Sequence, residues 1–260
     1  TDLALALFNY LSFDNSPTKK EIAIWAIDYF RFNPLTQLKE FEKQFLCISE
    51  GYDSEYDELF WEDPNNIFAH QQLPSWIDFE SAYPKNDKGE NMKAEEVFNK
   101  IGGDVKDGRD RSLVDPNQKP WNNACALRLS WALNKCGIKI PYIKEQTLKG
   151  GDGKYYFLGA RNMNMWMRKT FGCSNPNRSL GEFYNPQAHH YDQSKVGKFG
   201  VGLEKELKDG KFHGIYTIVT NSKFASGHCD LLFSNATCLL NCHFADAAVY
   251  IEYCDIWNLK

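Results

Sequence analysis

Apolar residues recur at helical spacing through much of the chain and at strand spacing near its C-terminal end. Two helices are predicted within residues 16–48, separated by Asn33-Pro34, and further helices over residues 76–83, 94–101, 124–136 and 161–171. From Gly214 the period becomes that of strands, which are predicted over residues 215–220, 228–233, 237–243 and 247–257. The acidic residues 50–63 and the polar residues 104–120 are predicted to be loops.

Composition narrows the class of protein. With 43% hydrophobic and 25% charged residues, a chain of 260 residues is not broadly disordered. No stretch approaches the roughly 18 apolar residues of a membrane helix, and a net charge of −4 argues against a general nucleic-acid binder. Residues 1–74 carry 13 acidic and 5 basic side chains, whereas residues 75–260 carry 21 acidic and 25 basic ones. We therefore expect an N-terminal helical and acidic extension over 1–74 and the main domain over 75–260.

The N-terminal residues and the cysteines argue against a signal peptide, a disulfide scaffold and a zinc site. Residues 1–11 have an apolar run but no basic region or small-residue cleavage site, so no signal peptide is expected. Eight cysteines are too few for a disulfide scaffold, and no cofactor is expected. The cysteines and histidines near the C-terminus do not have the spacing of a usual zinc site. They are His228, Cys229, Cys238, Cys242, His243 and Cys254.

Cys238 and Cys242 are a candidate disulfide. In one regular strand their Cα atoms would lie roughly 13 Å apart, which is too far for a bridge. A disulfide therefore requires the chain to turn between them, and two reduced, packed thiols are the alternative.

Cys125 lies at the start of the most regular predicted helix, with Asn122 or Asn123 as its cap. The helix dipole is positive there, by roughly half a charge, which favours the thiolate and makes the cysteine a candidate nucleophile. The unpaired N–H groups of the same turn, that of Cys125 included, can bind an oxyanion. The alternative is a small buried hydrophobic residue. Trp121 is a candidate for lining a cleft or packing on the helix, and Arg128 for binding a substrate carboxylate or forming an internal ion pair.

His228 and Asp230 lie two positions apart on a predicted strand, so their side chains share one face. A strand histidine facing a cysteine at a helix N-terminus is the general-base arrangement of papain-like enzymes. A histidine with a purely structural role is the alternative for His228.

These residues resemble a known family. The sequence Asn-Ala-Cys-Ala-Leu-Arg-Leu-Ser-Trp-Ala-Leu-Asn at 123–134, Ile140-Pro141, and Gly-His-Cys-Asp-Leu-Leu at 227–232 are similar to the fourth amidase effector family of bacterial type VI secretion systems. Ile101-Gly102-Gly103 and an aromatic residue, Phe244, after the Cys238/Cys242 pair are further matches. The resemblance covers about residues 75–260, and residues 1–74 resemble no family that we can name.

The resemblance implies an α+β fold, a papain-like domain of NlpC type in which the cysteine helix packs on an antiparallel sheet. It implies an antibacterial amidase that a type VI secretion apparatus delivers into the periplasm of target bacteria. There it would cut the peptidoglycan stem peptide between D-glutamate and meso-diaminopimelate, and a cognate immunity protein would inhibit it.

By the same resemblance, Cys125 is the nucleophile and His228 the general base and acid. The family places its orienting carboxylate near the second cysteine of the pair, where this chain has no aspartate. Asn241 and Asp230 are therefore both candidates for the third member. Asp230 is separated from His228 by roughly 6–7 Å along the strand.

Two other functions are compatible with a Cys/His pair. One is a papain-like protease or acyltransferase that acts on proteins. The other is a catalytically inactive module, in which residues 1–74 and the cleft bind a partner. Reaction of Cys125 with a thiol-directed probe would distinguish an active site from an inactive one.

Overall fold

The computed structural model describes residues 17–32, 34–35, 56–116, 121, 123–197, 200–220, 227–239, 242 and 251–260. Its helices are α2 (Pro17–Phe32), α4 (Glu58–Glu62), α5 (Trp76–Ala82), α6 (Ala94–Ile101), α7 (Gly103–Val114), α8 (Cys125–Lys135), α9 (Ala160–Phe171), α10 (Gln193–Val196) and α11 (Val201–Gly210), with a 3₁₀ turn at Arg178–Leu180. Its strands are β1 (Thr147–Lys149), β2 (Tyr155–Phe157), β3 (Ala188–Asp192), β4 (Gly214–Thr220), β5 (Gly227–Leu232) and β6 (Ile251–Asn258). No described helix is both long and apolar enough to span a membrane.

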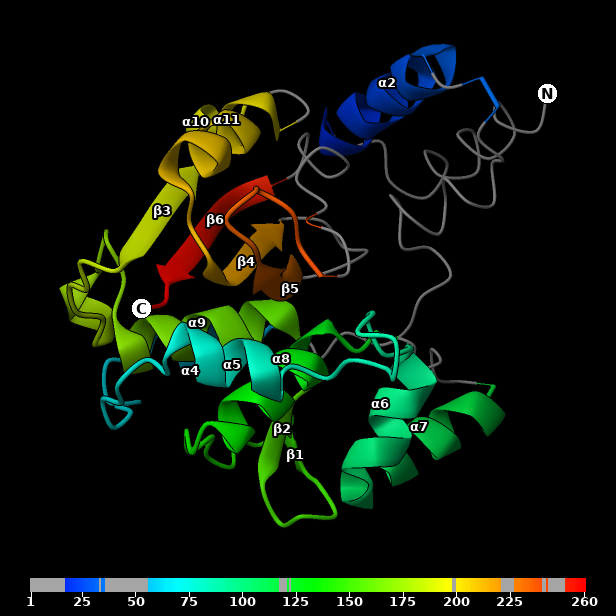
Figure 1. Cartoon of the computed structure of the whole chain (residues 1–260), viewed down its shortest axis with the longest axis vertical. Helices are drawn as coiled ribbons and strands as arrows, with labels where there is room; N and C mark the ends of the chain where they lie inside the picture. The colour runs from blue at the N-terminus through cyan, green and yellow to red at the C-terminus, as the bar shows by residue number, and fades with distance from the viewer. Residues whose placement is uncertain are drawn as a thin grey trace.

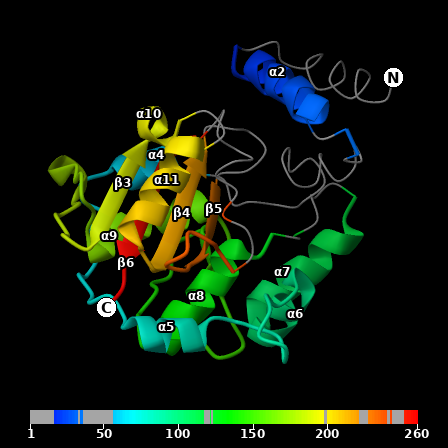
Figure 2. The same cartoon turned by 45° about the horizontal axis from the view of Figure 1, so that its top comes forward.

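The centre of the structure is a four-stranded antiparallel sheet with the order β3-β6-β4-β5 (Figure 1). Helices cover both of its faces, with α8 and α9 on one side and α10 and α11 on the other (Figures 1 and 2). The pleat divides the strand residues accordingly. Ile215 and Leu231 join the core shared with α8 and α9, whereas Tyr216 and Ile256 join the core beneath α10 and α11. Every residue of β4 is buried because both faces are covered.

Residues 56–74 pack on the same core as α8. Trp61 is fully buried, and its indole N–H donates to Asn162 Oδ1 of α9 at 2.8 Å. Gln71 pairs with the backbone of Lys139, donating to its carbonyl at 3.0 Å and accepting from its N–H at 2.8 Å. The division between residues 74 and 75 stays a prediction, but the segment that precedes it contributes directly to the core.

Two of the predicted loops contain helices. Within the acidic stretch, α4 begins after Asp57, whose carboxylate accepts from the N–H of Phe60 at 3.0 Å. Within residues 104–120, α7 buries only Val105, Gly108 and Ser112. These three lie at helical spacing, but two of them are small, so the apolar pattern is too weak to predict the helix. The second helix predicted within residues 16–48 lies outside the described residues.

The remaining differences lie between α8 and β6. Strands β1, β2 and β3 and helix α10 lie within residues 145–200, and α11 precedes β4; none of these was predicted. Residues 237–239 form an isolated antiparallel bridge and no strand: Cys238 pairs with Leu232 at the end of β5, and the N–H of Leu239 donates to Leu231 O at 3.0 Å. Of the predicted strand over residues 237–243, the other described position is Cys242. The strands over residues 215–220 and 228–233 are confirmed as β4 and β5, and β6 (Ile251–Asn258) confirms the described part of the strand predicted over residues 247–257.

Candidate active site

Cys125 is the first residue of α8, and its side chain contacts the edge strand β5, whose only neighbour among the described strands is β4. It is 2% exposed and belongs to the core cluster that includes Cys229 of β5. The N–H of Cys125 donates to Asn123 Oδ1 at 3.3 Å. Asn123 therefore satisfies one free N–H of the first turn, although the cap position itself is Ala124.

The geometry of the β5 edge brings both His228 and Cys229 to Cys125. Leu231 accepts a bond from Leu239 on the side away from β4. Alternation along a strand therefore turns the N–H of Cys229, two residues earlier, to the same open edge. Cys125 Sγ accepts from the N–H and from the thiol of Cys229, and it interacts with the His228 imidazole. The structure thus brings together the predicted nucleophile and the predicted base.

The electrostatics of this pair favour a thiolate and an imidazolium. The bond from the Cys229 thiol holds the pKa of Cys125 well below its usual value; burial opposes this shift, and His228 adds to it. Burial lowers the pKa of His228, but Asp230 and Cys125 raise it more, so that it reaches about 9. The two groups stabilise each other's charged form, as a nucleophile and its base require.

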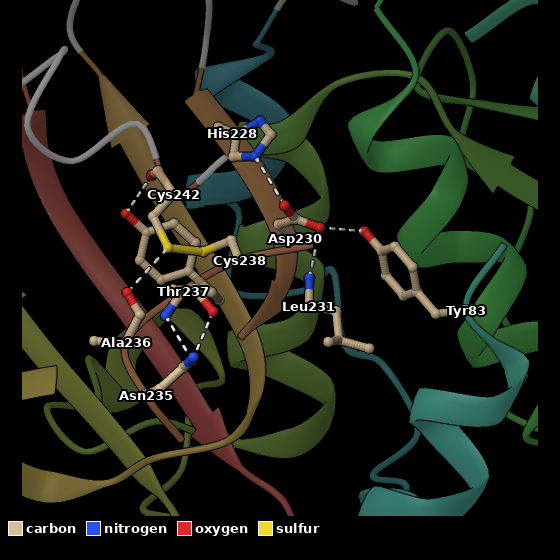
Figure 3. The surroundings of a disulfide bond; sticks show 10 residues. Tyr83, His228, Asp230, Leu231, Asn235, Ala236, Thr237, Cys238 and Cys242 are labelled. Carbon is tan, nitrogen blue, oxygen red and sulfur yellow. Dashed lines mark hydrogen bonds and ion pairs between the residues drawn. A yellow bond between two sulfur atoms is a disulfide. The ribbon is translucent and has the colours of Figure 1, made fainter. Parts of the chain in front are cut away.

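Asp230 lies beside His228, with Oδ2 at 3.8 Å from Nε2 (Figure 3). Its other oxygen, Oδ1, accepts from the hydroxyl of Tyr83 at 3.0 Å and from the N–H of Leu231 at 2.8 Å. The side chains therefore approach more closely than the spacing along the strand suggests. The rival candidate, Asn241, lies outside the described residues.

Arg128 and Trp121 lie close to the cysteine in sequence but make structural contacts. The Arg128 guanidinium is buried and donates to the carbonyl of Met92, at 2.7 Å from Nη2 and 3.2 Å from Nε. The Trp121 ring packs against Gly108 of α7 so closely that a Cβ there would lie 2.3 Å from the ring. Both residues thus fix the segments around the start of α8, and their roles toward a substrate stay predictions.

The structure contains a disulfide between Cys238 and Cys242, with Cα atoms 5.0 Å apart (Figure 3). The chain turns between the two cysteines, as a bridge at this spacing requires. The Tyr216 hydroxyl of β4 donates to the carbonyl of Cys242 at 2.7 Å. The disulfide therefore fixes the segment that follows β5 against the sheet.

The described residues show no metal centre, and the cavity found among them does not coincide with the cysteine. Within the described ranges, no group of three or more His, Cys, Asp or Glu side chains could hold a metal ion. A cavity of about 530 Å³ lies beyond the C-terminal end of α8, between residues 67–71, residues 137–141 and Trp166. The candidate chemistry is thus at the N-terminal end of α8 and this cavity near its other end.

Comparisons with known proteins agree with this arrangement. Residues 121–257, more than half of the chain, match the family model of Tae4, described as type VI secretion system amidase effector protein 4. The chain belongs to the Tae4 family. The matched region begins just before α8 and includes all of β4, β5 and most of β6. No curated protein sequence matches the chain.

Solved structures show the same fold. The structure is similar to the type VI effector Tae4 from Enterobacter cloacae, with 22% identity and a TM-score of 0.50, over 74% of this chain and all of that one. It is also similar to Tae4 in the Tae4–Tai4 effector–immunity complex from Salmonella Typhimurium, with 20% identity and a TM-score of 0.50, over 73% of this chain and all of that one. The predicted papain-like α+β fold of NlpC type is confirmed.

Two residues at the site were not predicted to act there. Cys229 was considered only as a possible zinc ligand, and its position next to His228 was the available signal. Tyr83 lies 147 positions before Asp230. No local pattern in the sequence connects these two residues.

Proposed function

We propose that this Tae4 family member is a cysteine amidase that hydrolyses peptidoglycan stem peptides, with Cys125 as nucleophile and His228 as general base and acid. The observation that carries the proposal is the contact between a thiol of lowered pKa at a helix N-terminus and an imidazole whose pKa is raised to about 9. Membership of an amidase effector family supports the same chemistry.

In the proposed reaction, the Cys125 thiolate attacks the amide carbonyl carbon and forms a tetrahedral intermediate. The negative charge moves to the carbonyl oxygen, which would replace Asn123 Oδ1 as the partner of the Cys125 N–H. The protonated His228 then gives its proton to the leaving amine, and the C–N bond breaks. Water, deprotonated by His228, hydrolyses the thioester and restores the thiol.

Asp230 is proposed as the orienting carboxylate. Its Oδ2 faces His228 Nε2 at 3.8 Å, and Oδ1 has two hydrogen-bond donors of its own. The negative charge stabilises the imidazolium, which raises the pKa of His228. A carboxylate that holds one imidazole nitrogen leaves the other free for the nucleophile.

The proposed substrate bond is that between D-glutamate and meso-diaminopimelate, at which the family resemblance points. The protein would act in the periplasm of target bacteria after secretion, and a cognate immunity protein would protect the producing cell. The similar proteins include Tae4 in complexes with the immunity protein Tai4, which supports a partner of this kind.

Activity is expected to have a bell-shaped pH profile. The midpoint of the acid limb should lie at a pH below the usual thiol pKa of about 8.5, because the pKa of Cys125 is lowered. The alkaline limb should fall near pH 9, where His228 loses the proton that the leaving amine needs. Measurement of kcat/KM between pH 4 and pH 11 would locate both limbs.

The test is digestion of isolated muropeptides, followed by mass spectrometry of the products. The protein should release fragments cut at the proposed bond, and Cys125→Ala should release none while remaining folded. Cys254→Ala, a change to a buried cysteine on β6, is the matched control and should remain active. Cleavage at another bond would correct the substrate, cleavage of denatured protein substrates alone would favour a protease, and full activity of Cys125→Ala would refute the mechanism.

A further inference from the structure

Tyr83 lies directly after α5, far from the catalytic residues in sequence but next to them in space. Its N–H continues the helix by donating to Phe79 O at 3.0 Å, and its ring packs edge-on against the Phe79 ring, with centroids 5.8 Å apart. The side chain is 2% exposed. Helix α5 packs on α8, so the helix that precedes Tyr83 is fixed against the helix that carries Cys125.

The Tyr83 hydroxyl is one of two donors to a single oxygen of Asp230. It donates to Oδ1 at 3.0 Å, and the N–H of Leu231 donates to the same oxygen at 2.8 Å (Figure 3). The Leu231 bond is local and leaves the carboxylate a range of rotations about its last bond. A second donor from another element limits that rotation and keeps Oδ2 directed at His228.

Tyr83 can act only as a donor over the working pH range. Burial raises the pKa of its hydroxyl well above 10, and the neighbouring charge of Asp230 raises it further; Arg128 opposes these effects. The phenol therefore remains protonated wherever His228 is protonated. Because Asp230 is completely buried, loss of this donor would not be compensated by bulk water.

We propose that Tyr83 is a positioning residue of the amidase site, which fixes the Asp230 carboxylate so that its other oxygen, Oδ2, orients and stabilises the His228 imidazolium. The inference rests on the proposed function, and it adds a fourth residue to Cys125, His228 and Asp230. Among the described residues, the titratable groups that act on His228 are Asp230 on its own strand and Cys125 from α8. Tyr83 from the end of α5 acts through the first of these.

The experiment compares Tyr83→Phe with Tyr156→Phe in the full chain. Tyr156 is a matched control because its buried hydroxyl also donates to an aspartate, Asp152 Oδ2, at 2.9 Å. The titration of His228 is followed by NMR of histidine-labelled protein and assigned with His228→Gln. The kcat, the KM and the pH profile are measured on muropeptides, and circular dichroism confirms that both variants fold.

In Tyr83→Phe the pKa of His228 should fall by about 1 unit, and the alkaline limb should move with it. The kcat should fall about tenfold with KM nearly unchanged, because an orienting contact is lost while substrate contacts remain. Tyr156→Phe should change neither property. A folded Tyr83→Phe protein whose His228 titration is unchanged or moves upward would overturn the inference.

The two proposals fail separately. The NMR titration requires no substrate, so it tests the Tyr83 contact even if muropeptides are not cut. If the wild-type protein cuts muropeptides but Tyr83→Phe keeps its kcat and pH profile, only the positioning role is wrong. If the His228 pKa falls in Tyr83→Phe while no muropeptide is cut by either protein, only the substrate is wrong.

Discussion

Two histidine–aspartate pairs lie at opposite edges of the same sheet. At one edge, His228 and Asp230 of β5 approach to 3.8 Å beside Cys125. At the other, His190 of β3 and Asp255 of β6 are partners in register, with His190 Nδ1 at 2.7 Å from Asp255 Oδ1. Judged by distance alone, the second pair has the better geometry for a catalytic dyad.

The difference lies in what surrounds the two carboxylates. Arg168 of α9 bonds both oxygens of Asp255, at 2.9 and 3.1 Å, and Asn164 donates to Oδ2 at 3.0 Å. The nearby cysteine, Cys173, has its pKa raised to about 12, chiefly by burial. A histidine, an aspartate and a cysteine thus occur near one another at both edges, but only at the β5 edge is the thiol pKa lowered.

The comparison teaches that a histidine–carboxylate contact does not by itself define a site. At the β5 edge the cysteine lies at a helix N-terminus and accepts bonds from a strand N–H that faces away from the sheet. At the β3 edge a guanidinium neutralises the carboxylate, and the cluster serves to join α9 to the sheet.

Replacing each histidine in turn should give the largest difference in kcat between the two edges of the sheet. His228→Ala should lower kcat by about 10³-fold or more, because both the base and the acid are lost. His190→Ala removes one bond to Asp255, which keeps its bonds to Arg168, so the kcat of the folded variant should change less than about threefold. Muropeptide hydrolysis by the two purified variants is the measurement, and equal losses of kcat would contradict the assignment.

Thiol labelling should distinguish the reactivity of Cys125 from that of Cys173, and it requires no substrate. In the native protein at pH 7, iodoacetamide should modify Cys125 first, because only thiolates react and the pKa of this thiol is lowered. Cys173 should remain unmodified, since its pKa is raised to about 12 and it is fully buried. Peptide mass spectrometry of timed samples gives both rates. Preferential modification of Cys173 would contradict the assignment of Cys125 as the reactive thiol.

The free energy of unfolding should show the opposite order, with a larger loss from a change at the β3 edge than from a change at the β5 edge. Arg168→Met leaves Asp255 and Glu182 buried without their shared cation, so it should lower the free energy of unfolding by about 3–5 kcal/mol. Asp230→Asn should cost less stability, since the amide oxygen can still accept from Tyr83 and Leu231, but it should lower kcat. Urea denaturation of both variants measures the difference. A greater loss of stability in Asp230→Asn would show that the β5 pair is the structural one.

The sequence was sufficient for the parts of the fold with strong periodicity and for naming Cys125 as the candidate nucleophile. The helix at residues 124–136 and the strands β4 and β5 follow from apolar spacing, and a cysteine at a helix start has a physical reason to be reactive. Helix α7 was not predicted because its buried face consists of Val105, Gly108 and Ser112. Its packing depends on Trp121, which reaches Gly108 from outside the helix.

The rest of the site depends on which strand lies at the edge of the sheet. Strand β5 has no partner strand beside Cys229 among the described residues, and only the sheet order reveals that this N–H faces Cys125. Tyr83 is likewise brought to Asp230 by the packing of α5 on α8. Sequence spacing predicts which residues share an element; contacts between elements this far apart in the chain follow only from the assembled core.

The smallest effect expected concerns Cys229. In Cys229→Ala the Cys125 thiolate loses one donor but keeps the Cys229 N–H, so the pKa of Cys125 should rise by about 1 unit. Cys229→Ser retains a donor of similar size and should restore the lower pKa, whereas Cys254→Ala, at a buried cysteine on β6, should leave it unchanged. The pH dependence of the iodoacetamide rate at Cys125 measures this shift. If all three variants titrate like the wild type, the Cys229 thiol contributes only packing, and the dipole of α8, His228 and the Cys229 N–H account for the reactivity of Cys125.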